Sequence, residues 1–167
     1  MSTNHGFPPI AAPDARILIL GSMPGKRSLE KHQYYAYPQN CFWQIMSDLL
    51  NIKPGLNYPQ RKKYLKLNHI AVWDVLASCD REGSLDSNID LSSARPNDFD
   101  IFFASHKHIR TVFFNGATAE RFFKRFISIN QKSVQLTQIR LPSTSPAHAS
   151  MTVQEKLKKW SVIKSYL

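Results

Sequence analysis

The sequence predicts an α/β protein: a single-domain three-layer α/β/α sandwich around a central four-stranded parallel sheet. Two observations predict this fold. Short apolar runs alternate with segments of helical periodicity, and three of the runs are almost continuously apolar. Unbroken runs are typical of strands buried on both faces, as in a parallel sheet. The length suits one domain spanning 1–167, in which 1–14 form an extended N-terminal segment.

Four strands are expected, and three of them carry the unbroken apolar pattern. The exception is Gln135–Leu141, in which polar and apolar residues alternate. The other three strands are Arg16–Gly21, Ile70–Val75 and Arg110–Asn115.

Helices are expected between and after these strands. The final segment, Val153–Leu167, has an apolar stripe with its lysines, Lys156 included, mostly off the stripe, and Thr152 and Glu155 have the spacing of a capping box. Because strands and helices alternate, ligands should bind beyond the carboxyl ends of the strands. The same three-to-four spacing of apolar residues occurs in two earlier groups, which are Phe42, Ile45, Met46 and Leu49, and Ala119, Phe122, Phe123 and Phe126.

The charge indicates a polyanionic partner. Twenty-two Lys and Arg against twelve Asp and Glu leave a net charge of +10, which favours nucleic acid, although a generic basic surface is the alternative. No apolar run approaches the roughly 18 residues of a membrane span, and no signal-peptide pattern begins the chain. We therefore expect no membrane association, and a cytoplasmic location that is nucleoid-associated if the source is prokaryotic. Two cysteines and six scattered histidines, without metal-binding spacing, predict no metal and no cofactor.

The first informative loop follows the first strand and reads Gly21-Ser22-Met23-Pro24-Gly25. Such a loop can aim backbone amides at an anion or at the edge of a base. It is not a phosphate-binding P-loop, because Gly25-Lys26 is followed by Arg27. A simple tight turn is the alternative.

The second segment, Tyr34–Trp43, places five aromatic residues close to one Gln and one Asn. Aromatic rings can stack on a base, and the amide of Asn40 can hold a water molecule. Alternatively, Asn40 caps the helix that follows, and both roles are compatible.

The third segment, Leu141–Ser150, is a rigid polar loop with two prolines, four serine or threonine hydroxyls up to Ser150 and one histidine. Such a loop suits phosphate contacts. A linker leading into the last helix would have the same composition.

Together these segments resemble the two signature motifs of the uracil-DNA glycosylase superfamily. Gly21–Gly25 is similar to its Gly-Ile-Asn-Pro-Gly motif, Tyr35–Trp43 to its aromatic-Ala-His-Pro-x-Asn-Arg-Phe-Trp block, and Leu141–Ser143 to its x-Pro-Ser motif. The hypoxanthine-DNA glycosylase branch is the most similar. It also shares four further blocks, which are Trp73–Val75, Gly83–Ser87, Phe113–Gly116 and Leu141–Ala147.

Two departures from the superfamily concern substrate and mechanism. Met23 stands where most relatives carry Asp or Asn to handle water, and Leu141 stands where the strongest uracil enzymes carry His. The missing histidine argues against efficient uracil excision. In the hypoxanthine branch the essential Asn lies in the aromatic block, where Asn40 matches it.

The resemblance implies a monofunctional glycosylase that flips a deaminated base out of DNA and acts as a monomer. Asn40 would be the catalytic residue and would position water. Asp74 would read the base or, equally, cap a turn, and Arg81, Ser84 and Asp86 would line the pocket. The implied base-binding residues are Ser22, Met23, Tyr35 and Asp74, and the DNA-binding residues are Pro24, Ser143, Thr144, Ser145 and His148.

Three alternatives differ from this hypothesis. A uracil or mismatched-thymine glycosylase stays within the superfamily, whereas a basic module that binds nucleic acid without cutting it, and more remotely a nucleotide hydrolase, do not. A lyase reaction, in which Lys26 or Lys31 forms a Schiff base, is a further alternative. That reaction needs a desolvated lysine, and both lysines lie in a polar stretch.

Overall fold

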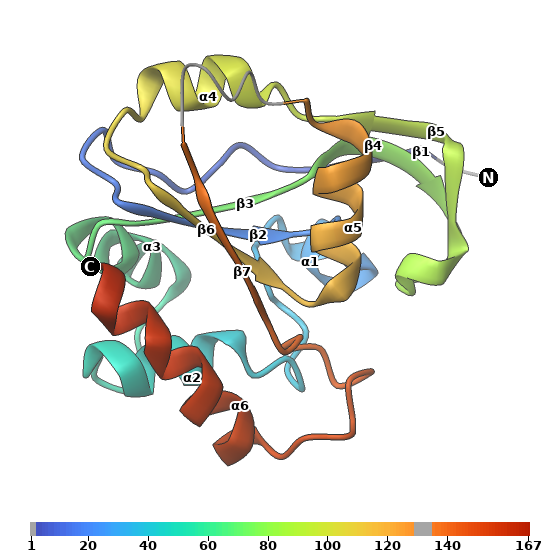
Figure 1. Ribbon diagram of the computed structural model, residues 1–167. Coiled ribbons are helices and arrows are strands. Elements are labelled where there is room, and N and C mark those ends of the chain that lie inside the picture. Colours follow the sequence, from blue (N-terminus) through green and yellow to red (C-terminus); the bar gives the residue numbers. More distant parts are fainter. Residues whose placement is uncertain (1–2, 129–134) are drawn as a thin grey trace.

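The centre of the protein is a parallel sheet, seen in a computed structural model that describes residues 3–128 and 135–167. Its strands lie in the order β3-β2-β6-β7 (Figure 1). Almost every residue of β2, β3 and β6 is buried, so the four-stranded parallel sheet predicted from the apolar runs is confirmed. The strands are β2 (Ile17–Gly21), β3 (Ile70–Asp74), β6 (Thr111–Asn115) and β7 (Thr137–Leu141).

The strand register brings the carboxyl ends of these strands into one row. Gly21 pairs with Asp74, and Asn115 pairs with Leu141. The two pairs are joined across the centre of the sheet by β2 and β6, which are also parallel neighbours. Four loops therefore leave the sheet at one edge, and two of them are segments singled out in the sequence, Gly21–Gly25 and Leu141–Ser150.

Helices cover both faces of the sheet. Neighbouring residues of a strand point to opposite faces. Phe114 packs on Phe123 of α5, and Phe113 packs on Tyr166 of η2, with ring centroids 5.3 and 5.4 Å apart. Figure 1 shows α4 above the sheet and α2 and α6 below it, which confirms the three layers.

The helices comprise six α-helices and two short 3-10 helices within the described residues, none of them long and apolar enough to cross a bilayer. The capping box predicted at Thr152 is present, with Glu155 as its partner. The helices are α1 (Lys26–Lys31), α2 (Phe42–Leu50), α3 (Tyr58–Leu67), η1 (Asp86–Asn88), α4 (Phe99–Ser105), α5 (Ala117–Phe126), α6 (Val153–Trp160) and η2 (Ser161–Tyr166).

A second sheet, which the sequence analysis did not predict, flanks the first. Its three antiparallel strands are β1 (Thr3–His5), β4 (Leu76–Arg81) and β5 (Ile89–Pro96), in the order β1-β4-β5. The strands β4 and β5 are rich in polar residues, so they lack the apolar run on which the prediction depended. The N-terminal segment, expected to be extended, contributes β1 and pairs at Ile10 with Val72 of the main sheet.

Two expectations for the C-terminal segment need correction. The α-helix ends at Trp160 and continues as a 3-10 helix, a common form of the last turns of a helix. Lys156, expected mostly off the apolar stripe, is instead buried, and its ammonium group donates a hydrogen bond to the Ser145 carbonyl at 3.2 Å.

Trp160 should be among the most costly side chains to remove. It is fully buried, packs on Phe42 with ring centroids 6.1 Å apart, and donates its indole N–H to the Pro142 carbonyl. We expect Trp160→Ala to lower the free energy of unfolding by about 3–5 kcal/mol, measured by urea denaturation. Ile101→Ala, at a side chain 66% exposed on α4, is the control and should change it by less than about 0.5 kcal/mol. Equal effects of the two substitutions would contradict this packing.

Candidate nucleic-acid active site

A cavity of about 670 Å³ opens at the carboxyl edge of the parallel sheet. Gly21, Asp74 and Asn115, the last residues of three strands, lie in its wall. The structure also brings together at this cavity all ten residues predicted for the site, which are Ser22, Met23, Pro24, Tyr35, Asn40, Asp74, Ser143, Thr144, Ser145 and His148.

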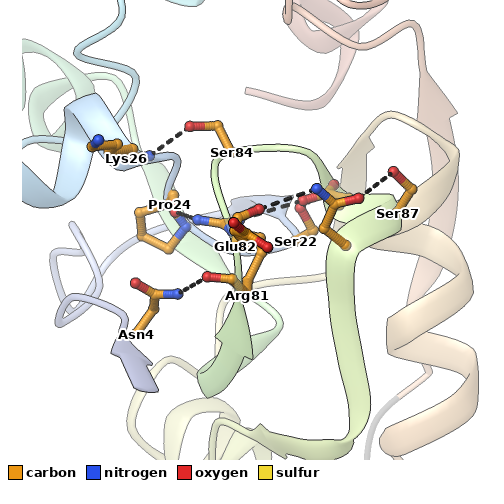
Figure 2. A network of polar contacts seen from close by, with 10 residues as sticks. Asn4, Ser22, Pro24, Lys26, Arg81, Glu82, Ser84 and Ser87 are labelled. Carbon is orange, nitrogen blue, oxygen red and sulfur yellow. Dashed lines mark hydrogen bonds and ion pairs between the residues drawn. The ribbon is translucent and has the colours of Figure 1, made fainter. Parts of the chain in front are cut away.

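The loop Ser22–Gly25 is held by β4 of the second sheet and by the segment that joins β4 to β5. The Ser22 hydroxyl donates to Asp86 Oδ2 at 2.6 Å, and the guanidinium of Arg81 donates to the Pro24 carbonyl. At the end of the loop, the Lys26 N–H donates to Ser84 Oγ at 3.0 Å. Figure 2 shows Arg81 beneath Pro24, and Ser84 reaching Lys26 on the other side.

Only two of the three polar residues expected to line the pocket do so. Ser84 and Asp86 line the cavity, as predicted, whereas Arg81 is 3% exposed at the end of β4 and lies behind the loop. Its Nη1 atom lies 3.7 Å from Asp86 Oδ1, so the buried cation faces a carboxylate. Because an isolated buried charge is costly, this pairing restrains the loop.

Asp74 is a buried carboxyl group at the floor of the cavity. Burial, and secondly the nearby Asp86 carboxylate, raise its pKa to about 7, although Arg81 acts in the opposite direction. Its Oδ2 atom is buried without a hydrogen-bond partner in the described part of the chain. A side chain at Gly21 would overlap this carboxyl group, so a residue larger than glycine at this position would displace Asp74.

Tyr35 lies beside Asp74 and stacks on the core. Its ring is 4.0 Å from that of Phe42 with an interplanar angle of 24°, so Phe42 covers one face of the Tyr35 ring. Its hydroxyl is also buried without a partner among the described residues, and burial together with Asp74 raises the pKa of this phenol. Tyr35 has a φ of +54°, a conformation that is uncommon for residues other than glycine and that often occurs at functional sites.

Asn40 caps the start of α2, which is one of the two roles considered for it from the sequence. Its Oδ1 accepts a hydrogen bond from the N–H of Phe42, the first residue of α2, at 3.0 Å. Its own N–H donates to the Tyr37 carbonyl at 2.9 Å. These bonds hold the partly exposed side-chain amide in one orientation at the cavity wall.

Thr144 anchors the loop that follows β7. Asn115 Nδ2 donates to its hydroxyl and the Thr144 N–H donates to Asn115 Oδ1, each at 2.9 Å. The Thr144 carbonyl accepts from the N–H of Cys41 at 3.1 Å. With only 1% of its surface exposed, Thr144 positions the loop, in contrast to the phosphate contact expected from the sequence.

The neighbours of Thr144 remain accessible at the cavity. Ser143, Ser145 and His148 are all partly exposed. Close packing beneath the loop is visible at Gly116, where a Cβ atom would approach the Ser143 Cβ to 2.9 Å. The loop therefore presents hydroxyls on a rigid base.

Three residues that line or support the site were missed in the sequence, and two of them had a signal. Asn115 ends a predicted strand at the carboxyl edge, where ligand-binding residues are expected. Leu85 lies inside a block already noted for its resemblance, and it lines the cavity. Lys156, the buried cation on the Ser145 carbonyl, had no signal because its neighbours on α6 are exposed lysines.

The structure disfavours a lyase reaction at this site. Lys26 and Lys31 are exposed, so neither has the desolvated environment that a Schiff-base lysine needs. Within residues 3–128 and 135–167, no group of three His, Cys, Asp or Glu side chains is arranged to hold a metal ion.

The buried carboxyl group of Asp74 predicts a pH-dependent stability. Its pKa is about 7 in the folded protein against an ordinary value of 3.8, so the folded state binds this proton more tightly than the unfolded chain does. Raising the pH from about 4 to about 7 should therefore reduce the free energy of unfolding, by up to about 4 kcal/mol from this group. Urea denaturation at pH 5 and pH 8 should show a larger loss for the wild type than for Asp74→Asn, which cannot titrate.

The exposed carboxylate of α2 provides the matched control for this measurement. Asp48→Asn removes the same charge without touching the cavity and should leave the wild-type pH dependence in place. If Asp74→Asn and Asp48→Asn behave alike, Asp74 is not the titrating group.

Comparisons with known proteins agree with this geometry. A family model described as the uracil DNA glycosylase superfamily matches residues 8–165. The hypoxanthine DNA glycosylase of Methanosarcina barkeri is 39% identical over 113 residues, 67% of this chain and 70% of that protein. The protein of the same name from Methanosarcina acetivorans is 38% identical over 117 residues, 69% and 72% of the two chains. A solution NMR structure from M. acetivorans, of a protein proposed to be a uracil DNA glycosylase, has a TM-score of 0.81 and 30% identity and covers 97% of this chain and 96% of its own. The resemblance inferred from the motifs is confirmed, and the chain belongs to the uracil-DNA glycosylase superfamily.

Proposed function

We propose that this protein is a monofunctional DNA glycosylase that hydrolyses the N-glycosidic bond of deoxyinosine, releasing hypoxanthine in base excision repair. One observation carries the proposal: the segments that resemble the family motifs line the same cavity. At the floor of this cavity, Asp74 Oδ2 is buried without a hydrogen-bond partner among the described residues. Two relatives named hypoxanthine DNA glycosylase, at 38 and 39% identity, support this substrate.

Asp74 suits the recognition of a deaminated base. Hypoxanthine carries a hydrogen at N1, whereas adenine has a lone pair there. An ionised Asp74 can accept from the N–H of hypoxanthine but repels the lone pair of adenine. A buried acceptor left unpaired by the wrong base costs more than a missed contact at the surface, which favours discrimination. Because uracil also has such an N–H, at N3, this contact alone does not exclude uracil.

The remaining groups suit the bond cleavage. Breaking the glycosidic bond places negative charge on the departing base and positive charge on the sugar, and water then adds to the sugar carbon. Backbone amides of Ser22 and Met23 would donate to the leaving base, and Tyr35 would stack on it with the ring face that Phe42 does not cover. Asn40 would orient the water; since an amide is a poor base, it acts by positioning.

The loop that follows β7, around Thr144, would bind the DNA backbone. Ser143, Ser145 and His148 would contact phosphates beside the flipped nucleotide, and phosphates can also stabilise the positive sugar. Pro24 would contribute a rigid loop whose carbonyl is already held by Arg81. The net charge of +10 favours the approach to DNA, and one such site per chain is sufficient for a monomer.

The proposal is tested by base release from duplexes that carry one lesion each. Under single-turnover conditions, we expect cleavage at deoxyinosine after alkali and none without it, with uracil and mismatched thymine released more slowly. Faster release of uracil would instead identify a uracil DNA glycosylase, the alternative that the name of the similar NMR structure favours. Binding of every duplex with no release would identify a non-catalytic nucleic-acid module.

Asn40→Ala should slow release from deoxyinosine by about 100-fold or more, because the water loses its positioning group. The substitution also removes the hydrogen bond to the N–H of Phe42, which should cost about 1 kcal/mol of stability, so the assay is run well below the melting temperature. Gln39→Ala, at the exposed adjacent residue, is the control and should keep the wild-type rate. Unchanged release by folded Asn40→Ala would remove Asn40 from the mechanism.

A further inference from the structure

A buried lysine lies behind the loop that follows β7, and the proposed chemistry makes no use of it. Lys156 of α6 is 4% exposed, and its ammonium group donates a hydrogen bond to the Ser145 carbonyl at 3.2 Å. Lys156 is not part of the cavity wall, whereas Ser145 is. In Figure 1 the loop runs from the end of β7 to α6, below the sheet. The positive charge therefore lies on the protein side of the loop proposed to bind the DNA backbone.

This charge has no counter-ion in the part of the chain that the structure describes. All twelve Asp and Glu residues lie within the described ranges, and none of them forms a salt bridge with Lys156. The neighbouring carboxylate, Glu155, accepts from Thr152 instead. Buried ions are normally paired, because taking a charge out of water is costly. The ammonium group has a carbonyl dipole beside it but no anion.

Folding alone does not explain a charge at this position. The Ser145 carbonyl also accepts from the N–H of His148 at 3.1 Å, so it would remain paired without the lysine. An unbranched apolar side chain such as methionine could fill the same space without the cost of burying an ion. The missing anion therefore indicates a ligand from outside the chain.

The loop directs its hydroxyl donors to the cavity and two of its carbonyl oxygens to buried groups. The Thr144 carbonyl accepts from the N–H of the buried Cys41 at 3.1 Å, and the Ser145 carbonyl faces Lys156. The hydroxyl oxygens of Ser143 and Ser145 each accept from a backbone N–H of the loop. Their own hydrogens can therefore be donated to phosphate oxygens at the cavity. A phosphate would meet hydroxyl donors here, with a positive charge behind them.

The charge acts beyond its own hydrogen bond. Burial raises the pKa of the Cys41 thiol, and the charge of Lys156 acts in the opposite direction. The field of the ammonium group thus reaches the start of α2, next to Asn40. Because water is excluded around a buried group, its attraction to an anion is weakened less by solvent and screened less by salt than that of a surface lysine.

We infer that Lys156 supplies the positive charge of the phosphate site, an inference that rests on the proposed function. The anion that its ammonium group lacks is the DNA phosphate held by Ser143 and Ser145 beside the flipped nucleotide. The ammonium group acts through the loop and does not touch the DNA, so Lys156 is a positioning residue. A positive charge near the sugar does not help to form the sugar cation, so Lys156 should strengthen binding and leave bond cleavage almost unchanged.

The test compares Lys156→Met with Lys158→Met, which removes the same charge from an exposed position of the same helix. Affinity is measured on a duplex with an uncleavable 2′-fluoro analogue of deoxyinosine, and single-turnover release on deoxyinosine at increasing protein concentration. We expect Lys156→Met to weaken binding and raise the half-saturating concentration about tenfold. Its rate at saturating protein should stay within about threefold of the wild type. Lys158→Met should change each quantity by less than about threefold.

Stability separates this role from a purely structural one. Because an unpaired buried charge is removed, Lys156→Met should have a urea midpoint equal to or higher than that of the wild type. A lower midpoint together with a slower saturating rate would mean that Lys156 only holds the loop, and it would overturn the inference. Equal affinity in Lys156→Met and the wild type, or equal losses in the two variants, would also overturn it. If the wild type releases no hypoxanthine, it is the proposed function that fails.

Discussion

The cavity depends on one pair of hydrogen bonds, those between the Asn115 side chain and Thr144. Asn115 ends β6 at the centre of the carboxyl edge, and Thr144 lies in the loop after β7, so the pair fixes that loop to the sheet. Through its carbonyl, Thr144 also accepts from Cys41, directly before α2. The start of α2, where the Asn40 amide is held, is thereby tied to the same point. The buried Asn115 amide donates to the Thr144 hydroxyl and accepts from the Thr144 N–H. Replacing either residue leaves buried polar groups unpaired, and it should loosen both the loop after β7 and the start of α2.

The opposite wall is held by charge. Arg81 reaches from the second sheet to the Pro24 carbonyl and faces Asp86, which in turn accepts from Ser22. Burial is the largest cause of the raised pKa of Asp74; Asp86 raises it further, whereas Arg81 opposes it. Arg81 and Asp86, which position the loop Ser22–Gly25, therefore also affect the pKa of Asp74, the residue proposed to read the base. Although the net charge is +10, the two acidic residues Asp74 and Asp86 lie at the place proposed for the edge of the base. The basic residues elsewhere suit contacts with phosphates.

The sequence predicted the parallel sheet because buried parallel strands are apolar throughout, and it located the cavity because ligands bind where such strands end. Ten residues named from the motifs do line one cavity, although their chemical roles remain predictions. What the sequence could not provide came from long-range pairing. The strands β4 and β5 have no apolar run, and their structure rests on pairing with each other and with β1. Thr144 and Lys156 read as surface residues, because their partners, Asn115 and the Ser145 carbonyl, lie 29 and 11 positions away along the chain.

The proposed function requires that the base enters this cavity and is read by Asp74. The most direct measurement is a crystal structure of the protein with a duplex that carries an uncleavable 2′-fluoro analogue of deoxyinosine. We expect a flipped hypoxanthine in the cavity, with its N1–H within hydrogen-bonding distance of Asp74 Oδ2 and the Asn40 amide facing the sugar carbon. A base that stays stacked in the duplex, or that lies in the cavity with its N1 edge turned away from Asp74, would contradict it.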